Sequence, residues 1–350
     1  MANPPRFDFS LRRRLLSPQT AISFVGLIAF VVFVVMRFDI DWRATWSVLR
    51  GADPGRFALA ILVHYTTFVF RGARWSLLLA NVARSHGEPA RPPGMLHAGL
   101  LIHISWFANS VTWFRMGDAY RAYAYAEDTK TSFPRAAGTV LADRLVDVVV
   151  VVALMALGMG ILYVGGQVRP PLVFILMAIG LLVAIVAGLS AMLFLRKWVT
   201  PRLPGRVRGA YERFHAGTMG SFGNMPLVLG LGVLGWLAEV GRLFCVMAAL
   251  NVQAAPGLIL FVPMANGLLS AVPLTPGGLG IVEAGISGLL RLQLAVPLAL
   301  AVALADRVIS YLSIVVTGGI AFAVRQVSIG KRRARESRLA GARATDAPTE

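Results

Sequence analysis

The chain has 350 residues, of which 57% are hydrophobic and 15% are charged, and its mean hydropathy is +0.68. This composition excludes a sizeable soluble domain and indicates a polytopic membrane protein. The formal charge of +17 does not indicate nucleic-acid binding, because the basic residues cluster between apolar runs instead of forming one continuous surface. We expect anionic lipid at the basic loops and no nucleic-acid partner.

Apolar runs predict six membrane-crossing helices, which cover about residues 21–36, 57–80, 136–164, 171–195, 224–250 and 298–324. Arginines at 12–14 precede the first run and place segment 1–20 in the cytoplasm. We interpret that run as an uncleaved span, since more membrane follows it. The linker 196–213 holds six basic residues against one acid and is the strongest cytoplasmic signal. We expect a bacterial-type inner-membrane protein with both termini cytoplasmic and a basic, disordered tail over 325–350.

Two further apolar stretches are interrupted and predict hairpins that enter the membrane and return. Residues 95–117 are apolar but carry scattered polar side chains, and residues 118–135 are predicted as a polar loop. A full crossing here would place the basic linker 196–213 outside, so we expect this hairpin to enter from the cytoplasm.

The second interrupted stretch, residues 273–283, reads Pro-Leu-Thr-Pro-Gly-Gly-Leu-Gly-Ile-Val-Glu. Its two prolines and three glycines exclude an uninterrupted helix. Broken backbone at membrane depth is tolerated only where protein or a watery cavity covers it. The carboxylate of Glu283 in this apolar run also needs a partner. We therefore expect a second hairpin, entering from the outer side, and a functional site within it.

Short segments that recur at a nearly constant separation suggest an internal repeat. Ala108 and Asn109 return as Ala265 and Asn266, 157 residues later, and the Ala-Asp-Arg run at 142–144 returns at 305–307, 163 residues later. Arg74 and Arg242, 168 residues apart, precede the two hairpins in the same order. Each half, about 57–164 and 224–324, reads as span, hairpin, span, and the two halves run in opposite directions. The predicted fold is an all-α integral membrane domain over 21–324, with about six transmembrane helices and two re-entrant hairpins in an inverted repeat.

The same residues resemble the lysylphosphatidylglycerol synthase transmembrane-region family, whose members are also described as flippase-like membrane proteins. Segment 273–283 is similar to the family pattern Pro-x-x-Pro-Gly-Gly-Leu-Gly-x-x-Glu, and Arg71 with Arg74-Trp75 is similar to Arg-x-x-Arg-Trp. The stretch from Asn109 to Arg121 resembles a third pattern, from which it departs by Asp118 in place of glutamate and by lacking a proline near 112–113. Asp143 is a second aspartate in place of a family glutamate.

The resemblance implies an inner-membrane protein related to proteins linked to translocation of lipid headgroups or lipid-linked sugars. In the multiple peptide resistance factors this region accompanies a cytoplasmic aminoacyl transferase domain. That domain has no counterpart in this sequence, so we expect no lysylphosphatidylglycerol synthesis by this chain alone.

Buried arginines and carboxylates are the groups that a lipid headgroup would need on crossing the membrane. Guanidinium groups hold phosphate in two-point geometry, and the acids could bind an amine or sugar hydroxyls or carry a proton. The alternative is that acids and arginines pair and hold the helices together. The predicted substrate-binding residues are Arg71, Arg74, Asn109, Arg115, Asp118, Arg121, Asp143, Arg144, Asn266, Pro273, Pro276, Gly277, Gly278, Gly280, Glu283, Asp306 and Arg307.

No catalytic, metal or cofactor motif is convincing. His97 and His103 are six residues apart and do not share a helical face suited to a metal pair, and there is no Walker motif. The leading interpretation is a lipid flippase or transporter. Two alternatives remain: a membrane transferase on a lipid-linked substrate, with Asp118 or Glu283 as general base, and a non-transporting partner of a synthase or glycosyltransferase.

Overall fold

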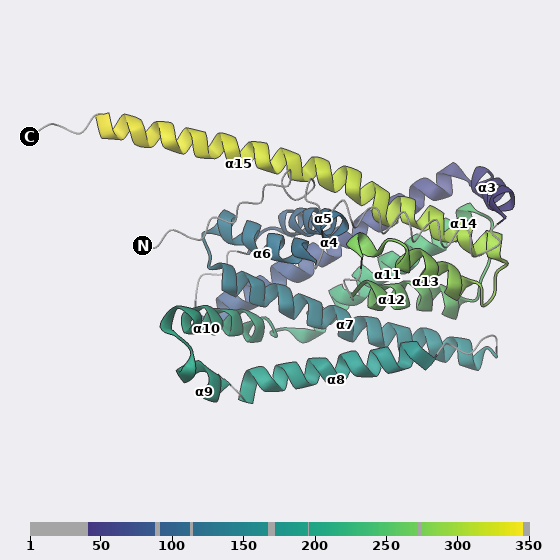
Figure 1. Ribbon diagram of the computed structural model, residues 1–350, viewed down its shortest axis with the longest axis horizontal. Coiled ribbons are helices and arrows are strands. Elements are labelled where there is room, and N and C mark those ends of the chain that lie inside the picture. The colour runs from purple at the N-terminus through teal and green to yellow at the C-terminus, as the bar shows by residue number, and fades with distance from the viewer. Residues whose placement is uncertain are drawn as a thin grey trace, which may run out of the picture.

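The computed structural model describes residues 41–87, 92–112, 115–166, 172–194, 196–271 and 275–345, and these residues form helices joined by turns (Figure 1). The expected first span, 21–36, lies outside the described residues. The helices are α3 (Trp42–Arg50), α4 (Pro54–Ser85), α5 (Met95–Val111), α6 (Met116–Thr129), α7 (Phe133–Val164), α8 (Leu172–Phe194), α9 (Arg196–Val199), η1 (Thr200–Arg202), α10 (Gly205–Gly220), α11 (Met225–Ala249), α12 (Pro256–Ala271), η2 (Pro276–Gly278), α13 (Ile281–Leu290), α14 (Val296–Arg307), η3 (Val308–Ser313) and α15 (Ile314–Thr345).

Among the described residues, four helical segments are long and apolar enough to cross a membrane, and they match four of the predicted spans. They are α7, α8, α11 and the continuous stretch Val296–Arg332 formed by α14, η3 and α15. The expected span 57–80 lies within α4, which has 32 residues but carries buried Arg71 and Arg74. These helices confirm an all-α membrane protein over the described residues.

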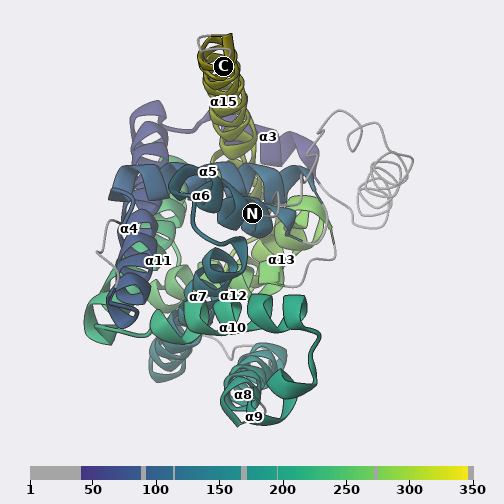
Figure 2. The ribbon, with the colours of Figure 1, turned by 90° about the vertical axis from the view of Figure 1, so that its left-hand side faces the viewer.

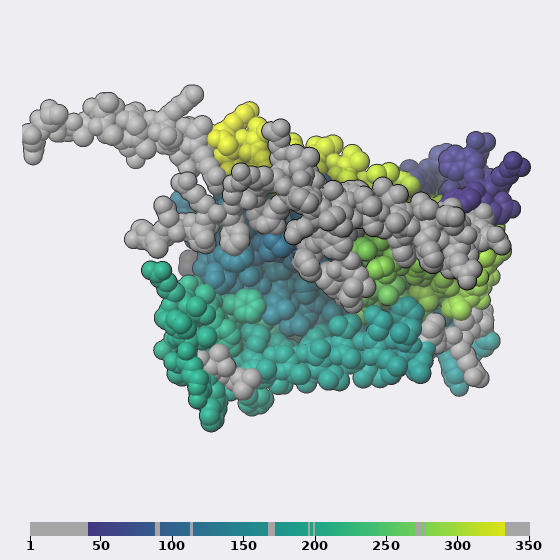
Figure 3. All heavy atoms as spheres, in the orientation of Figure 1, coloured from purple at the N-terminus to yellow at the C-terminus, as the bar shows by residue number. Residues whose placement is uncertain are grey.

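The helices form an elongated bundle with α15 along one side and α8 along the other (Figures 1 and 2). Only Phe174 and Ala178 of α8 are buried. The rest of α8 lies on the surface, along the lower edge of the molecule in Figure 3. Such an apolar exposed surface suits contact with lipid. The basic segment α9–α10 and the end of α15 lie at the same end of the bundle, opposite to α3 and α14.

The first hairpin consists of α5 and α6, which lie at the basic end of the bundle (Figure 1). The expectation of a polar loop over 118–135 is wrong, because α6 continues as a helix to Thr129. Its small and aromatic side chains pack inward, with Tyr120, Ala122 and Ala124 all buried. Charged residues at every few positions suggested a loop, whereas the buried face between them stabilises a helix.

The second hairpin consists of α12 and α13, joined by the broken backbone that the sequence predicts. Gly277, Gly278 and Gly280 all have positive φ, of 59°, 69° and 82°. A side chain at Gly277 would meet the Tyr311 ring at 2.4 Å, so glycine is required there both for backbone conformation and for space. This hairpin lies in the opposite half of the bundle from α5 and α6 (Figure 1).

The C-terminal segment differs from the predicted disordered tail, because α15 is helical as far as Thr345. Its composition is rich in Arg, Ala and Lys, which favour helix. Arg325 also ties α15 to the first hairpin, since both of its Nη atoms donate to the Asp128 carboxylate at 2.9 Å. His97 Nε2 lies 3.1 Å from the same carboxylate. The α5–α6 pair is thus fastened at its open end.

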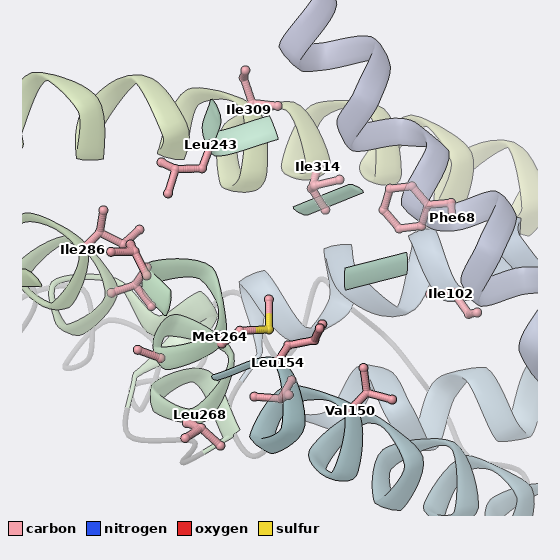
Figure 4. Packing of buried hydrophobic residues seen from close by; sticks show 14 of the residues in the cluster. Phe68, Ile102, Val150, Leu154, Leu243, Met264, Leu268, Ile286, Ile309 and Ile314 are labelled. Carbon is pink, nitrogen blue, oxygen red and sulfur yellow. The ribbon is translucent and has the colours of Figure 1, made fainter. Parts of the chain in front are cut away.

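The apolar core draws side chains from both halves of the chain (Figure 4). Phe68 and Ile102 come from α4 and α5, whereas Met264 and Ile286 come from α12 and α13. Close helix contacts depend on small residues: a Cβ on Gly72 of α4 would lie 2.2 Å from the carbonyl oxygen of Met95. The two hairpins and the long helices therefore pack as one body around the site described next.

Candidate functional site

A cavity of about 420 Å³ lies where the tips of the two hairpins meet. The first hairpin contributes Asn109, Arg115 and Asp118, and the second contributes Asn266 and Gly277. The long helices α4, α7 and α11 form the rest of the wall. The described residues that line it are Arg71, Trp106, Asn109, Ser110, Thr112, Arg115, Asp118, Arg144, Asp147, Val148, Val151, Trp236, Glu239, Arg242, Pro263, Asn266, Gly267, Leu268, Ser270, Thr275, Gly277 and Gly278.

Arg115 joins the two tips directly. Its Nη1 donates to the carbonyl oxygen of Ser270, at 2.7 Å, near the end of α12. Arg115 has φ of +52°, a left-handed conformation that is uncommon for a residue with a side chain. A second contact joins the tip of the first hairpin to η3, since the Tyr311 hydroxyl donates to the Ser110 carbonyl at 3.4 Å. An unfavourable backbone state is thus maintained at the point where the tips meet.

Asp147 is the centre of the ion network in the first half. Arg71 Nη1 donates to both of its carboxylate oxygens, at 2.9 and 3.1 Å, and Arg74 Nη1 lies 2.9 Å away. Trp236 Nε1 also donates to this carboxylate at 3.1 Å. The Arg71 guanidinium lies between two indole rings, 5.4 Å from Trp106 and 4.7 Å from Trp236. Arg71 is therefore fixed at the cavity wall by charge and by aromatic contacts.

Behind this wall lies a buried group around Asp143. Arg74 Nη2 is 2.8 Å from Asp143 Oδ1, and Arg121 Nη1 is 3.0 Å from Asp143 Oδ2. Arg121 also lies over the Trp75 ring at 4.7 Å. None of the three charged side chains lines the cavity. Their contacts correspond to the structural alternative, in which buried acids and arginines hold helices together.

Asp118 links the first hairpin to α7 at the cavity edge. Arg144 Nη2 lies 2.6 Å from Asp118 Oδ1, and Arg144 Nε donates to Oδ2 at 3.1 Å. Arg115 Nε adds a longer contact of 3.5 Å. The carboxylate thus meets two guanidinium groups that both line the cavity.

The second half contains a corresponding group around Arg242. Its Nε donates to Asp306 Oδ1 at 2.7 Å, and its Nη1 contacts Glu239 and lies 3.2 Å from His64 Nδ1. Asp306 and His64 are fully buried, whereas Arg242 and Glu239 reach the cavity. Charge is therefore placed on the α11 side of the cavity as well as on the α7 side.

Glu283 does not line the cavity but contacts Gly280 and Arg307 beside it. One carboxylate oxygen accepts from the Gly280 amide at 2.6 Å, which caps the start of α13, and the other lies 2.7 Å from Arg307 Nε. Arg307 Nη2 also donates to the Gly277 carbonyl at 2.9 Å. These three contacts fix the glycine turn whose backbone lines the cavity.

We expect Glu283→Gln to lower the free energy of unfolding by about 1 kcal/mol, because an amide oxygen can still cap α13 while the ion pair is lost. Glu283→Ala removes both contacts and is expected to cost about twice as much. Thermal unfolding in detergent, followed for both variants, measures the difference. Equal losses would show that the cap contributes nothing.

The structure brings together eight of the predicted site residues and separates the others. Those that line the cavity are Arg71, Asn109, Arg115, Asp118, Arg144, Asn266, Gly277 and Gly278. Those that lie behind the wall are Arg74, Arg121, Asp143, Gly280, Glu283, Asp306 and Arg307. Pro273 and the side chain of Pro276 lie outside the described residues.

Sequence reasoning missed several wall residues, notably Trp106, Trp236 and Glu239. A tryptophan in the middle of an apolar helix is one signal that could have indicated them, since its indole N–H needs a partner when buried. A second signal is the position of Glu239 three residues before Arg242, a spacing that places both on one helical face.

Ion pairs in the two halves join corresponding positions. Arg74 pairs with Asp143 as Arg242 pairs with Asp306, at separations of 168 and 163 residues along the chain. Each hairpin also has an acid on its return limb that pairs with an arginine in the following helix. These pairs are Asp118 with Arg144 and Glu283 with Arg307.

Comparison with known proteins agrees with the motifs. The chain is 27% identical over 227 residues to a UPF0104 membrane protein of Methanocaldococcus jannaschii, covering 64% of this chain and 97% of that one. It is 23% identical over 314 residues to a UPF0104 membrane protein of Methanothermobacter thermautotrophicus, covering 80% and 87%. Similarity to glycosyltransferase AglD of Haloferax volcanii, 25% over 301 residues, covers 73% of this chain and 46% of that protein.

The family described as the lysylphosphatidylglycerol synthase TM region matches residues 20–318. That range includes all the apolar helices from α4 to α14 and both hairpins. The resemblance drawn from the motifs is thereby confirmed. The chain is a multi-pass integral membrane protein that belongs to the lysylphosphatidylglycerol synthase TM region family.

Proposed function

We propose that the protein moves the headgroup of a phospholipid or a lipid-linked molecule across the membrane through the cavity between the hairpin tips. The observation that carries this proposal is a charged cavity of about 420 Å³ inside a bundle of apolar helices. Charged side chains at membrane depth are costly and mark substrate pathways. A polar headgroup needs such groups to replace its water, while acyl chains stay in the surrounding lipid.

The charges of the cavity favour an anionic group in the substrate. Four arginines of the described lining, Arg71, Arg115, Arg144 and Arg242, face three acids, Asp118, Asp147 and Glu239. The excess of one positive charge complements a phosphate diester, and guanidinium forks match its oxygens. Arg115 is the best placed phosphate ligand, because its strongest contact is to a neutral carbonyl and not to a carboxylate.

We also propose that the two halves form an inverted repeat. The matched ion pairs support this arrangement, as does the approach of the hairpins from opposite ends of the bundle. In inverted-repeat transporters, broken helices of both halves meet at a central substrate site. The basic α9–α10 segment and the end of α15 lie at one end, which supports an inner-membrane protein with its C-terminus in the cytoplasm. Their arginines would bind anionic lipid there.

A transferase on a lipid-linked substrate is less well supported by the site. Asp118 is held by Arg144 and Arg115, and Glu283 by Arg307 and the Gly280 amide, so neither carboxylate is placed as a general base. The observation in its favour is the similarity to the Haloferax relative, which is named as a glycosyltransferase and of which less than half is covered. A partnership with a synthase or glycosyltransferase follows from the same similarity.

Reconstitution into liposomes tests the proposal. Fluorescent-headgroup phospholipids that cross to the outer leaflet become accessible to a membrane-impermeant quencher, and wild type should make them accessible faster than empty liposomes. We expect Arg115→Gln to slow this at least about tenfold, since one charge-assisted phosphate contact contributes roughly 1.5–3 kcal/mol.

Arg84→Gln is the matched control, because Arg84 is an exposed arginine near the end of α4 and does not line the cavity. Thermal unfolding of both variants separates lost transport from lost folding. Unchanged headgroup movement in a folded Arg115→Gln protein would contradict the cavity as the path. Covalently altered lipid in the products would favour the transferase instead.

A further inference from the structure

The two halves carry opposite charges at one pair of corresponding positions that line the cavity. Arg71 and Arg74 in α4 correspond to Glu239 and Arg242 in α11, both at a separation of 168 residues. Arg74 and Arg242 have equivalent acidic partners, but an arginine faces the cavity in one half and a glutamate in the other. The second half therefore has an acid where the first has a base.

A second difference between the halves lies directly beside Arg74 and Arg242. At the same separation, His64 of α4 corresponds to Gly232 of α11. A Cβ on Gly232 would lie 3.1 Å from Arg74 Nη1, and His64 Nδ1 lies 3.2 Å from Arg242 Nη1. The equivalent place thus holds no side chain in one half and an imidazole in the other.

The contacts of His64 leave hydrogen-bonding capacity unused. Its Nδ1 is 3.4 Å from Glu239 Oε1, and that oxygen has no hydrogen-bond partner among the described residues. Its Nε2 is likewise without a partner there. The side chain is fully buried, while Glu239 reaches the cavity. Nδ1 of this buried imidazole lies between a guanidinium and a carboxylate, and it can accept from Arg242 only while the ring is neutral with its proton on Nε2, whereas a protonated ring donates from Nδ1.

The local charges make a proton favourable at this place. Arg242 contacts two acids, Glu239 and Asp306, so this group of three ions carries one net negative charge. In the first half Arg71, Arg74, Arg121 and Arg144 face three acids, Asp118, Asp143 and Asp147, so the corresponding network has no excess of acid. Other titratable groups near His64 are His103 on α5 and Tyr65 on its own helix, and Arg71 adds positive charge facing Glu239.

We propose that His64 and Glu239 form a proton-binding site at the cavity wall and that headgroup movement is coupled to proton binding there. One proton from the aqueous phase adds to Nδ1 of His64, and the resulting N–H donates to Glu239 Oε1. The contact of Arg242 with Nδ1 is lost in the same step, and Arg242 keeps its contact with Asp306. The guanidinium becomes more available to an anion in the cavity. The coupling part of this proposal rests on the proposed function, whereas the proton site does not.

Nuclear magnetic resonance of the ¹⁵N-labelled imidazoles tests the proton site in detergent-solubilised full-length protein. The chain has five histidines, and the His64 signal is the one that disappears in His64→Gln. We expect it to change from imidazolium to neutral imidazole as the pH is raised. In Glu239→Gln the midpoint should move to lower pH, because the carboxylate that stabilises the imidazolium is gone. A His64 signal that stays in one form from pH 5 to pH 9 would overturn the proton site.

Liposomes with a pH difference across the membrane test the coupling. One proton per headgroup gives about a tenfold difference between leaflets for each pH unit, because one unit corresponds to 1.36 kcal/mol. Wild type and His86→Gln, which changes an exposed histidine at the end of α4, should show this asymmetry, and His64→Gln should show none. Movement without asymmetry in wild type would overturn the coupling alone. Absence of any headgroup movement would overturn the proposed function and the coupling together, and the titration would still decide the proton site.

Discussion

Replacing Arg74 with leucine is expected to lower the free energy of unfolding by about 3–5 kcal/mol, because it leaves two buried carboxylates without their shared partner. Arg74 is 0% exposed and lies 2.8 Å from Asp143 and 2.9 Å from Asp147. Arg121 and Arg71 would still contact these acids, so the loss should fall below that of removing every partner. Unfolding by sodium dodecyl sulfate in mixed micelles measures the change.

Arg84→Gln is the control for this experiment, since Arg84 lies on the same helix but is exposed. We expect it to change the free energy of unfolding by less than about 0.5 kcal/mol. A double variant, Arg74→Leu with Asp143→Leu, should lose more than Arg74→Leu alone, because it also removes the carboxylate that the buried Arg121 contacts. If Arg74→Leu were as stable as Arg84→Gln, the network would not hold these helices together.

Gly117→Ala is expected to have the second large effect, with a loss of about 3 kcal/mol and a disordered first hairpin. A Cβ on Gly117 would lie 2.0 Å from the Ser105 carbonyl oxygen and 2.7 Å from Asn109 Oδ1. The Ser105 carbonyl is backbone and cannot move aside alone, so α5 and α6 must separate. The same change weakens the hydrogen bond from the Gly117 amide to Asn109, 2.8 Å in length, that closes the turn.

Gly180→Ala in α8 provides the comparison, because no atom lies within 4 Å of a Cβ there. Alanine favours helix more than glycine does, so this variant should be unchanged or slightly more stable. Melting temperatures in detergent and binding of a fluorescent phospholipid should both fall for Gly117→Ala only. Similar behaviour of the two variants would show that the hairpin tolerates separation of its helices.

Much of the fold was predictable because membrane spans carry their own signal. Apolar runs of sufficient length predicted α7, α8 and α11 closely, and the prolines and glycines of 273–283 predicted the break after α12. The return limb α6 was mispredicted, because the apolar side chains that stabilise it alternate with charges and pack only against other helices. Tertiary contacts of that kind cannot be inferred from local composition.

The sequence predicted which region forms the site, but not which of its residues line the cavity. Both hairpins contribute to the cavity, as their interrupted sequences suggested, and Arg115 and Asn266 reach it. Arg121, Asp143 and Asp306 carry equally suggestive charges but lie behind the wall, where Arg121 pairs with Asp143 and Asp306 pairs with Arg242. The rotation of a helix about its axis decides which of its charged side chains face a cavity and which face another helix. The charge pattern of the sequence does not give this rotation.

The ion pair between Arg325 and Asp128 limits how the first hairpin can move. It fixes the end of α6 to α15 by two hydrogen bonds of 2.9 Å, far from the tip where Arg115 contacts Ser270. A helical pair held at its base can pivot but cannot slide, so any displacement is greatest at the opposite extremity. A rotation of the hairpin about the Arg325–Asp128 contact would therefore displace its tip, at the rim of the cavity, more than its base.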